Sequence, residues 1–218
     1  MIRLVFLSDT HALHGRVRVP EGDVLVHCGD FTRKGDFIDV IEFDRFLAAQ
    51  PHAHKIVIAG NHDICFERFP TRALEHLTHC TYLLDSSTTA MGLRFWGSPW
   101  QPWFYDWSFN LPRGEKLREK WALIPDDVDI LVTHGPPRGI LDVTDDGRTE
   151  GCDDLRARVD EIAPPVHAFG HIHEGSGVKR EGKTTFVNAA ICTAGYAPTN
   201  PARVLDVDPV TKKVKVVR

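Results

Sequence analysis

The chain has 218 residues, of which 42% are hydrophobic and 26% charged, and its formal net charge is −4 at pH 7. This composition is typical of a globular protein and excludes a fibrous or intrinsically disordered chain. An acidic chain also lacks the basic surface with which proteins bind long nucleic acids, so we expect no such partner.

Five short runs of apolar, often β-branched residues predict buried strands of a parallel sheet. They cover residues 2–7, 23–27, 55–59, 129–133 and 166–169. Two further strands are expected at 81–84 and 93–96, separated by a polar turn. Amphipathic segments predict helices over 36–50 (with Asp36 as the N-cap), 71–79, 112–123 and 153–162.

The other segments differ in character. Residues 97–112 are rich in aromatic residues and proline without a clear period, which predicts a long ordered loop or lid. Residues 177–187 and 203–217 alternate between apolar and polar, as in an antiparallel sheet. No repeat or linker interrupts the chain, so we expect a single domain over residues 1–218 with two packed sheets.

Cysteine usage and the N-terminal residues predict the compartment. The five cysteines form no Cys-x-x-Cys pair, which is typical of reduced thiols. The first residues contain no basic region, long apolar run or cleavage site, so we expect neither a signal peptide nor a membrane span. The expected location is the cytoplasm, with no membrane partner.

Polar side chains follow each of the five predicted buried strands. In open α/β sheets ligands bind outside the carboxyl ends of the strands, so we expect these side chains to converge on one crevice. Gly60 should permit the sharp turn that presents its neighbours, because glycine adopts backbone angles that other residues resist. The side chains, in chain order, are Asp9 and His11, Asp30, Asn61 and His62, His134, and His171 and His173.

These side chains offer oxygen and nitrogen donors without a thiolate, which suits Mn²⁺, Fe, Zn²⁺ or Mg²⁺. Apart from His62 they number seven, too many for one ion, so we predict two divalent ions that share Asp30 as a bridging carboxylate. Such a pair lowers the pKa of a bound water and clamps an oxyanion.

Each motif taken alone has a simpler interpretation. Asp9-x-His11 by itself is more often a surface turn, and His171-x-His173 could be two solvated histidines. His27 and His167 lie inside predicted strands, where we expect hydrogen-bonded core histidines and no ligand role. The ordered recurrence of polar residues at strand ends is what favours a metal site.

The ordered set Asp9-x-His11, Gly29-Asp30, Gly60-Asn61-His62-Asp63, His134 and Gly170-His171-x-His173 resembles the calcineurin-like metallophosphoesterase superfamily. Within it, the chain is most similar to the small metallophosphoesterase-domain-containing proteins, near the class III cyclic-nucleotide phosphodiesterases. The motifs that carry this closer similarity include Gly97-Ser-Pro-Trp-Gln-Pro-Trp-Phe and Gly170-His-Ile-His-Glu-Gly. The resemblance implies an α/β fold, a four-layer αββα sandwich of two mixed sheets flanked by helices.

The resemblance also implies roles for individual residues. His62 would protonate the leaving oxygen, and Asp63 would orient His62. The two ligand sets would be Asp9, His11, Asp30 and His173 for the first metal, and Asp30, Asn61, His134 and His171 for the second.

The expected activity is hydrolysis of small phosphodiesters such as cyclic nucleotides, by attack of a metal-bridging hydroxide with His62 as general acid. Manganese is the expected metal, with iron, zinc or magnesium as alternatives. Asn61 and His62 would touch the phosphate, and aromatic residues including Trp100 and Trp103 would stack a nucleobase. For any single ring, packing of the lid is the alternative interpretation. The rival functions are a phosphomonoesterase or protein phosphatase, and a scaffold that has lost its chemistry.

Overall fold

The first three predicted strands lie side by side and parallel in one six-stranded mixed sheet of the computed structural model, which describes residues 1–217. The C-terminal strands extend this sheet on one side in antiparallel fashion. Its strand order is β14 (Val214–Val216), β13 (Arg203–Val207), β1 (Ile2–Leu7), β2 (Val24–His27), β3 (His54–Val57) and β4 (Thr81–Tyr82).

The second sheet also has six strands, with a parallel centre and an antiparallel strand at each edge. Its strand order is β11 (Gly177–Glu181), β12 (Thr184–Asn188), β10 (Val166–Phe169), β9 (Ile130–Thr133), β6 (Leu93–Ser98) and β5 (Ser86–Ala90). Both sheets are therefore mixed, with the predicted buried strands at their centres.

Alternation of apolar side chains along the strands explains why the sheets pack against each other. Leu4 and Phe6 of β1 belong to a buried cluster that also contains Ile130 of β9, so this cluster fills the space between the sheets. Val5 of β1 belongs to a different cluster, which also contains residues of α1. Because alternate side chains of a strand point to opposite faces, each sheet buries one face against the other sheet and one against helices.

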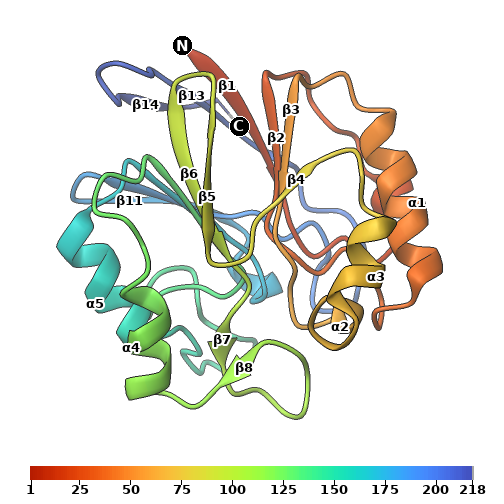
Figure 1. Cartoon of the computed structure of the whole chain (residues 1–218). Helices are drawn as coiled ribbons and strands as arrows, with labels where there is room; N and C mark the ends of the chain where they lie inside the picture. Colours follow the sequence, from red (N-terminus) through yellow and green to blue (C-terminus); the bar gives the residue numbers. More distant parts are fainter. Residues whose placement is uncertain (218) are drawn as a thin grey trace.

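Helices cover the outer face of each sheet (Figure 1). Val40, Phe43 and Leu47 of α1 are buried against the first sheet, and Leu117 of α4 against the second. The predicted four-layer αββα sandwich is confirmed. The helices are α1 (Phe37–Ala48), α2 (Ile64–Arg68) and α3 (Pro70–Glu75) over the first sheet, and α4 (Glu115–Trp121) and α5 (Asp153–Ile162) over the second.

Several local predictions were wrong. The segment predicted as a polar turn contains β5, and β4 and β6 lie in different sheets. The two C-terminal hairpins, β11–β12 and β13–β14, join different sheets and do not form one sheet of their own. Asp36 is the N-cap of α1, as predicted, although its side chain makes no capping hydrogen bond. The aromatic loop contains a short parallel pair, β7 (Gln101–Pro102) and β8 (Asn110–Leu111).

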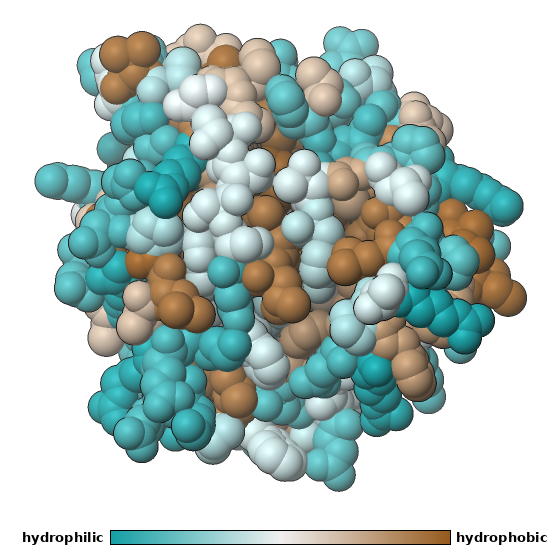
Figure 2. All heavy atoms as spheres, viewed as in Figure 1, coloured by the Kyte–Doolittle hydropathy of each residue, from teal (hydrophilic) through white to brown (hydrophobic). Residues whose placement is uncertain are grey.

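Hydrophilic side chains cover much of the face drawn in Figure 2, where apolar side chains form separate groups. Within residues 1–217, no helix has both the length and the apolar character needed to cross a membrane.

Candidate metal centre

The carboxyl ends of the parallel strands in the two sheets meet at one edge of the sandwich. The Gly170 amide donates to the His134 carbonyl at 2.9 Å, which joins the loops after β10 and β9. In the first sheet the His11 amide donates to the Asp30 carbonyl at 3.0 Å. A parallel bridge between Ser8 and Ala190 connects the two sheets. The predicted strand-end loops therefore lie together.

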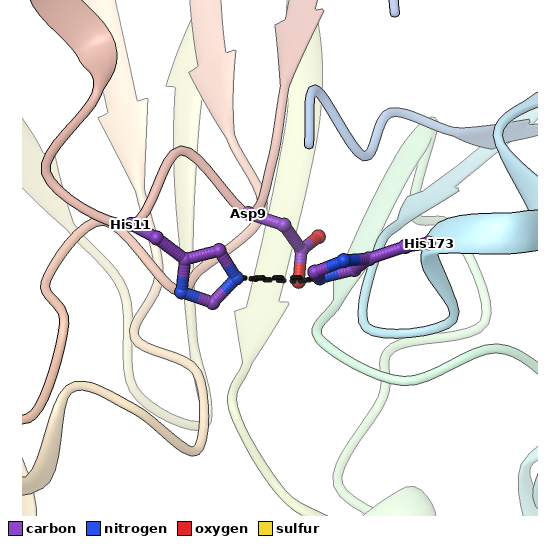
Figure 3. Close-up of side chains that lie close together, drawn as sticks. All are labelled: Asp9, His11 and His173. Atoms are coloured by element: carbon purple, nitrogen blue, oxygen red, sulfur yellow. Dashed lines mark hydrogen bonds and ion pairs between the residues drawn. The ribbon is translucent and has the colours of Figure 1, made fainter. Parts of the chain in front are cut away.

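One group of candidate ligands consists of Asp9, His11 and His173, whose side chains point toward one another in Figure 3. His173 Nε2 lies 3.3 Å from Asp9 Oδ1 and 3.2 Å from His11 Nε2. Asp9 and His11 follow β1 of the first sheet, whereas His173 follows β10 of the second. Residues more than 160 positions apart thus present ligand atoms within 4.8 Å of one another.

A second group is formed around Asp30 and His134, together with Asp9. His134 Nε2 lies 3.5 Å from Asp30 Oδ2 and 2.9 Å from Asn61 Oδ1. The His171 ring lies beside the His134 ring, with 5.1 Å between their centroids. Asp30 also belongs to a third group, with His11 and His62. Asp9, His11 and Asp30 each belong to two of the three groups, so the groups overlap and form one continuous cluster of ligand atoms.

Two of the candidate histidines, His134 and His173, share a hydrogen-bonding pattern that fixes which nitrogen faces the site. Nδ1 of His134 lies 2.9 Å from the Cys28 carbonyl, and Nδ1 of His173 lies 3.0 Å from the Thr193 carbonyl. Because a carbonyl can only accept, each Nδ1 carries a proton and donates it. This arrangement leaves Nε2 for the site, as is usual for metal-binding histidines.

Gly60 is required here for space, not for an unusual backbone angle. It is not among the glycines with positive φ, so the predicted reason for this glycine was wrong. A Cβ at Gly60 would overlap the Asp30 carboxylate and would also meet the His134 ring. The backbone after β3 can approach both side chains only because this residue has no side chain.

Four of the candidate ligands have left-handed backbone conformations. The φ angles are 52° for Asp9, 43° for His11, 58° for Asp30 and 66° for His171. Each such conformation costs about 1–3 kcal/mol in a residue other than glycine and persists only where the surroundings enforce it. The loops thus hold these side chains in the site at a cost to stability.

The charges of this site suit divalent cations. Asp9 and Asp30 are at most 2% exposed, and among residues 1–217 their ion pairs are all with histidines, not with lysine or arginine. Burial alone would raise the pKa of each carboxyl, but His173 beside Asp9 and His134 beside Asp30 lower both. Buried carboxylates with no fixed cation, next to imidazole nitrogens, match the donor set of a hard or borderline metal ion.

The same interactions act on the histidines. Burial lowers the pKa of His134 and His173, but the negative charges of Asp30 and Asp9 outweigh it and raise both to about 9. Burial, together with the charge of His134, lowers the pKa of His171 to about 3. Metal binding requires deprotonated ligands, so a cation would displace the protons that His134 and His173 hold.

Asp63 does not orient His62 in the structure, which corrects the role that the resemblance implies. The Asp63 carboxylate accepts hydrogen bonds from the amides of Gly60, Asp30 and Thr32 at 2.8–2.9 Å. It therefore holds two ligand-bearing turns together. The His62 ring is held instead by the Arg33 carbonyl, which lies 2.6 Å from Nδ1.

The aromatic residues of the loop have different surroundings. Trp100 is half-buried, donates to Asp85 at 3.0 Å and packs edge-on against Phe109, whereas the residues that line the pocket over the candidate ligands do not include it. Trp103 lies in the wall of the pocket and is 62% exposed. The Trp107 ring stacks on His62.

Tyr196 is a pocket residue that the sequence analysis did not single out. Its ring packs edge-on against His11 at 4.8 Å and against His173 at 5.6 Å. Its φ of 58° places it among the residues with left-handed backbone. No metal-ligand motif includes Tyr196, so its place in the pocket is evident only from its contacts with His11 and His173 in the folded chain.

A pocket of about 440 Å³ lies over these groups. The candidate ligands Asp30, Asn61, His171 and His173 line it, together with His62. On its outer side the lining continues to aromatic and charged side chains, namely Trp103, Phe104, Tyr105, Arg148, Glu150 and Tyr196. Its volume suits a small organic ligand.

Comparison with known proteins identifies the family. Residues 2–175 match the family model described as calcineurin-like phosphoesterase. Human metallophosphoesterase domain-containing protein 1 is 47% identical over 229 residues, which cover 94% of this chain and 70% of the human one. A UPF0046 protein of Caenorhabditis elegans is 42% identical over 213 residues, which cover 88% of this chain and 75% of that one.

Solved structures share the fold at lower identity. The crystal structure of TT1561 of Thermus thermophilus aligns with a TM-score of 0.63 and 15% identity, over 100% of this chain and 98% of that one. The family match spans most of the sequence, and the human relative is nearly half identical. The chain therefore belongs to the calcineurin-like phosphoesterase family.

Proposed function

We propose that the chain is a dinuclear-metal-dependent phosphodiesterase that acts on small diesters such as cyclic nucleotides. The observation that carries this proposal is the convergence of carboxylate, amide and imidazole donors from both sheets under one pocket. Family membership independently supports phosphoric ester hydrolysis.

In this proposal the ligands divide into two sets that share Asp30. When bound, two divalent ions would lower the pKa of a water molecule and neutralise charge on the phosphoryl oxygens. Manganese is the proposed metal. Asp9, His11, Asp30 and His173 hold the first ion, and Asp30, Asn61, His134 and His171 the second.

His62 acts as the general acid and Asn61 contacts the phosphate. As an oxygen from water forms its bond to phosphorus, the bond between phosphorus and the leaving oxygen breaks. The electron pair of that bond stays on the leaving oxygen, which takes the proton from Nε2 of His62. The hydrogen bond from Nδ1 to the Arg33 carbonyl supports this role because it leaves Nε2 for the pocket.

The outer part of the pocket supports a diester over a monoester. A diester carries a second organic substituent, and the lining beyond the candidate ligands includes Trp103, Phe104 and Tyr105. Aromatic faces bind planar groups without requiring one particular base.

The five free cysteines support a reducing compartment, and we propose the cytoplasm.

The test is hydrolysis of cyclic nucleotides, linear diesters and monoesters by protein reconstituted with Mn²⁺, with metal content measured on the same samples. We expect the diesters to be hydrolysed fastest. His62→Ala should lower kcat by about 10²–10⁴-fold while two metal ions per chain remain bound. Loss of metal from this variant would make His62 a ligand, and faster hydrolysis of monoesters would contradict the substrate class.

A further inference from the structure

The indole of Trp107 lies against the imidazole of His62. Their centroids are 4.2 Å apart and their planes are inclined by 26°, which is a stacked arrangement. Both side chains are half-buried. Trp107 comes from the aromatic loop before β8, whereas His62 follows β3 in the first sheet.

Three contacts together restrict the His62 ring. The Arg33 carbonyl accepts from Nδ1, Trp107 covers one face, and His11 lies edge-on at 4.6 Å with an interplanar angle of 73°. The His62 amide also donates to Asp30 Oδ1 at 2.8 Å, which fixes the backbone. The Tyr196 ring also lies edge-on to His62 but farther away, at 6.4 Å, so the Trp107 stack is the closer of the two ring contacts from outside the metal-centre loops.

The loop holds Trp107 firmly in this position. The Trp107 carbonyl accepts from Asn110 Nδ2 at 3.0 Å, and the next amide, of Ser108, donates to the Asn61 carbonyl at 3.3 Å. Phe109 is 2% exposed and packs in the core beneath the loop. The stack is therefore built on a fixed backbone and does not depend on the exposed tip of the loop.

We propose that Trp107 is a positioning residue for the general acid, which rests on the proposed function of His62. A hydrogen bond from Nδ1 to one carbonyl fixes only one atom of the ring, so an imidazole held in this way alone can still rotate about its side-chain bonds. The stacked indole removes those rotations and keeps Nε2 facing the leaving oxygen. Correct orientation of a proton donor contributes to rate only where the leaving group needs the proton.

This dependence on the leaving group gives the test. Aryl methyl phosphates with a 4-nitrophenyl or an unsubstituted phenyl leaving group differ in how much they need protonation. In the Mn²⁺-loaded protein, Trp107→Ala should lower kcat for the phenyl ester by about tenfold or more and for the 4-nitrophenyl ester by less than about threefold. Trp107→Phe should restore most of the loss.

Two further measurements separate positioning from packing. In a His62→Ala background, Trp107→Ala should cause no additional loss of kcat, because the group that it positions is absent. In the metal-free protein, the ring-proton NMR signals of His62 should lie upfield because of the indole ring current, and should move downfield in Trp107→Ala.

An equal loss for both leaving groups, an additive loss in the His62→Ala background, or unmoved His62 signals would overturn this inference and leave the proposed function standing. If His62→Ala alone affects both leaving groups equally, the proposed role of His62 fails, and the role of Trp107 fails with it. Thermal unfolding of Trp107→Ala and Trp107→Phe checks that both variants are folded.

Discussion

At the scale of a single residue, the close contacts of Gly60 predict that even a small side chain there would disrupt the candidate metal centre. A methyl group there would overlap Asp30 and His134, so Gly60→Ala must displace a candidate bridging ligand. We expect activity to fall by at least about 10²-fold and unfolding free energy to fall by about 1–3 kcal/mol. Metal content and urea unfolding measure the two effects. Gly15→Ala is the matched control, because a Cβ at Gly15 meets nothing within 4 Å.

Residue types and their order predicted the donors of the site, but not what each one touches. Asp9, Asp30 and His134 could be predicted because each follows a recognisable apolar run. The contacts of Asp63 and Trp107 could not, because they join segments whose relative position only the folded chain sets. Asp63 therefore holds backbone turns together, whereas the family resemblance implied that it would orient His62.

At the scale of elements, Asn110 closes the aromatic loop. Its Nδ2 donates to the carbonyls of Phe104, Tyr105 and Trp107 at 2.9–3.2 Å. Asn110→Ala should free this loop while the two sheets stay intact, so we expect kcat/KM to fall by about 10- to 100-fold. Hydrogen exchange of residues 103–108 should accelerate.

Asn110→Asp is the matched comparison for this loop, because it keeps the acceptor oxygen but removes the donors. Because its second carboxylate oxygen would face the three carbonyls, it should free the loop at least as much as Asn110→Ala if the bonds to these carbonyls hold the loop. Unchanged exchange in both variants would show that β7 and β8 suffice to hold it.

Sequence patterns failed to predict two features of the sheets, each for a physical reason. β5 reads Ser-Ser-Thr-Thr-Ala and is paired on one side only, so its small polar residues show no apolar alternation. The central strands were predicted because both of their faces are buried. Alternation of apolar and polar residues also does not indicate which strand a segment pairs with. The assignment of β11–β12 and β13–β14 to separate sheets could therefore not be predicted from the sequence.

At the scale of the whole molecule, the two halves of the sandwich share a buried feature. Each sheet buries one histidine of a central strand, His27 at the carboxyl end of β2 and His167 in the first half of β10. Each imidazole Nε2 contacts a threonine hydroxyl, Thr10 at 3.1 Å and Thr133 at 2.9 Å. They are the core histidines expected from the sequence, one in each layer between sheet and helices.

Burial lowers the pKa of both His27 and His167 to about 3, below the usual value of about 6.5 in an unfolded chain. Nδ1 of each ring has no hydrogen-bond partner among residues 1–217, so a proton there would be buried without an acceptor. Between pH 6.5 and 3 the unfolded chain binds more protons than the folded one. The contribution of these two histidines to the unfolding free energy is therefore fully present above about pH 7 and is lost as the pH drops through this window, by up to about 1.4 kcal/mol per pH unit for each histidine.

Urea unfolding at pH 7.5, 6 and 5 in the presence of a chelator measures this dependence without a contribution from metal release. His167→Gln removes one titrating group. As the pH drops, the unfolding free energy of this variant should therefore fall less steeply than that of the natural chain, by up to about 1.4 kcal/mol per pH unit. The variant loses stability at pH 7.5, where the contact with Thr133 is weakened, and the difference from the natural chain should shrink toward pH 5. Parallel curves for the two proteins would mean that His167 has the same pKa in the folded and the unfolded chain and would contradict this prediction.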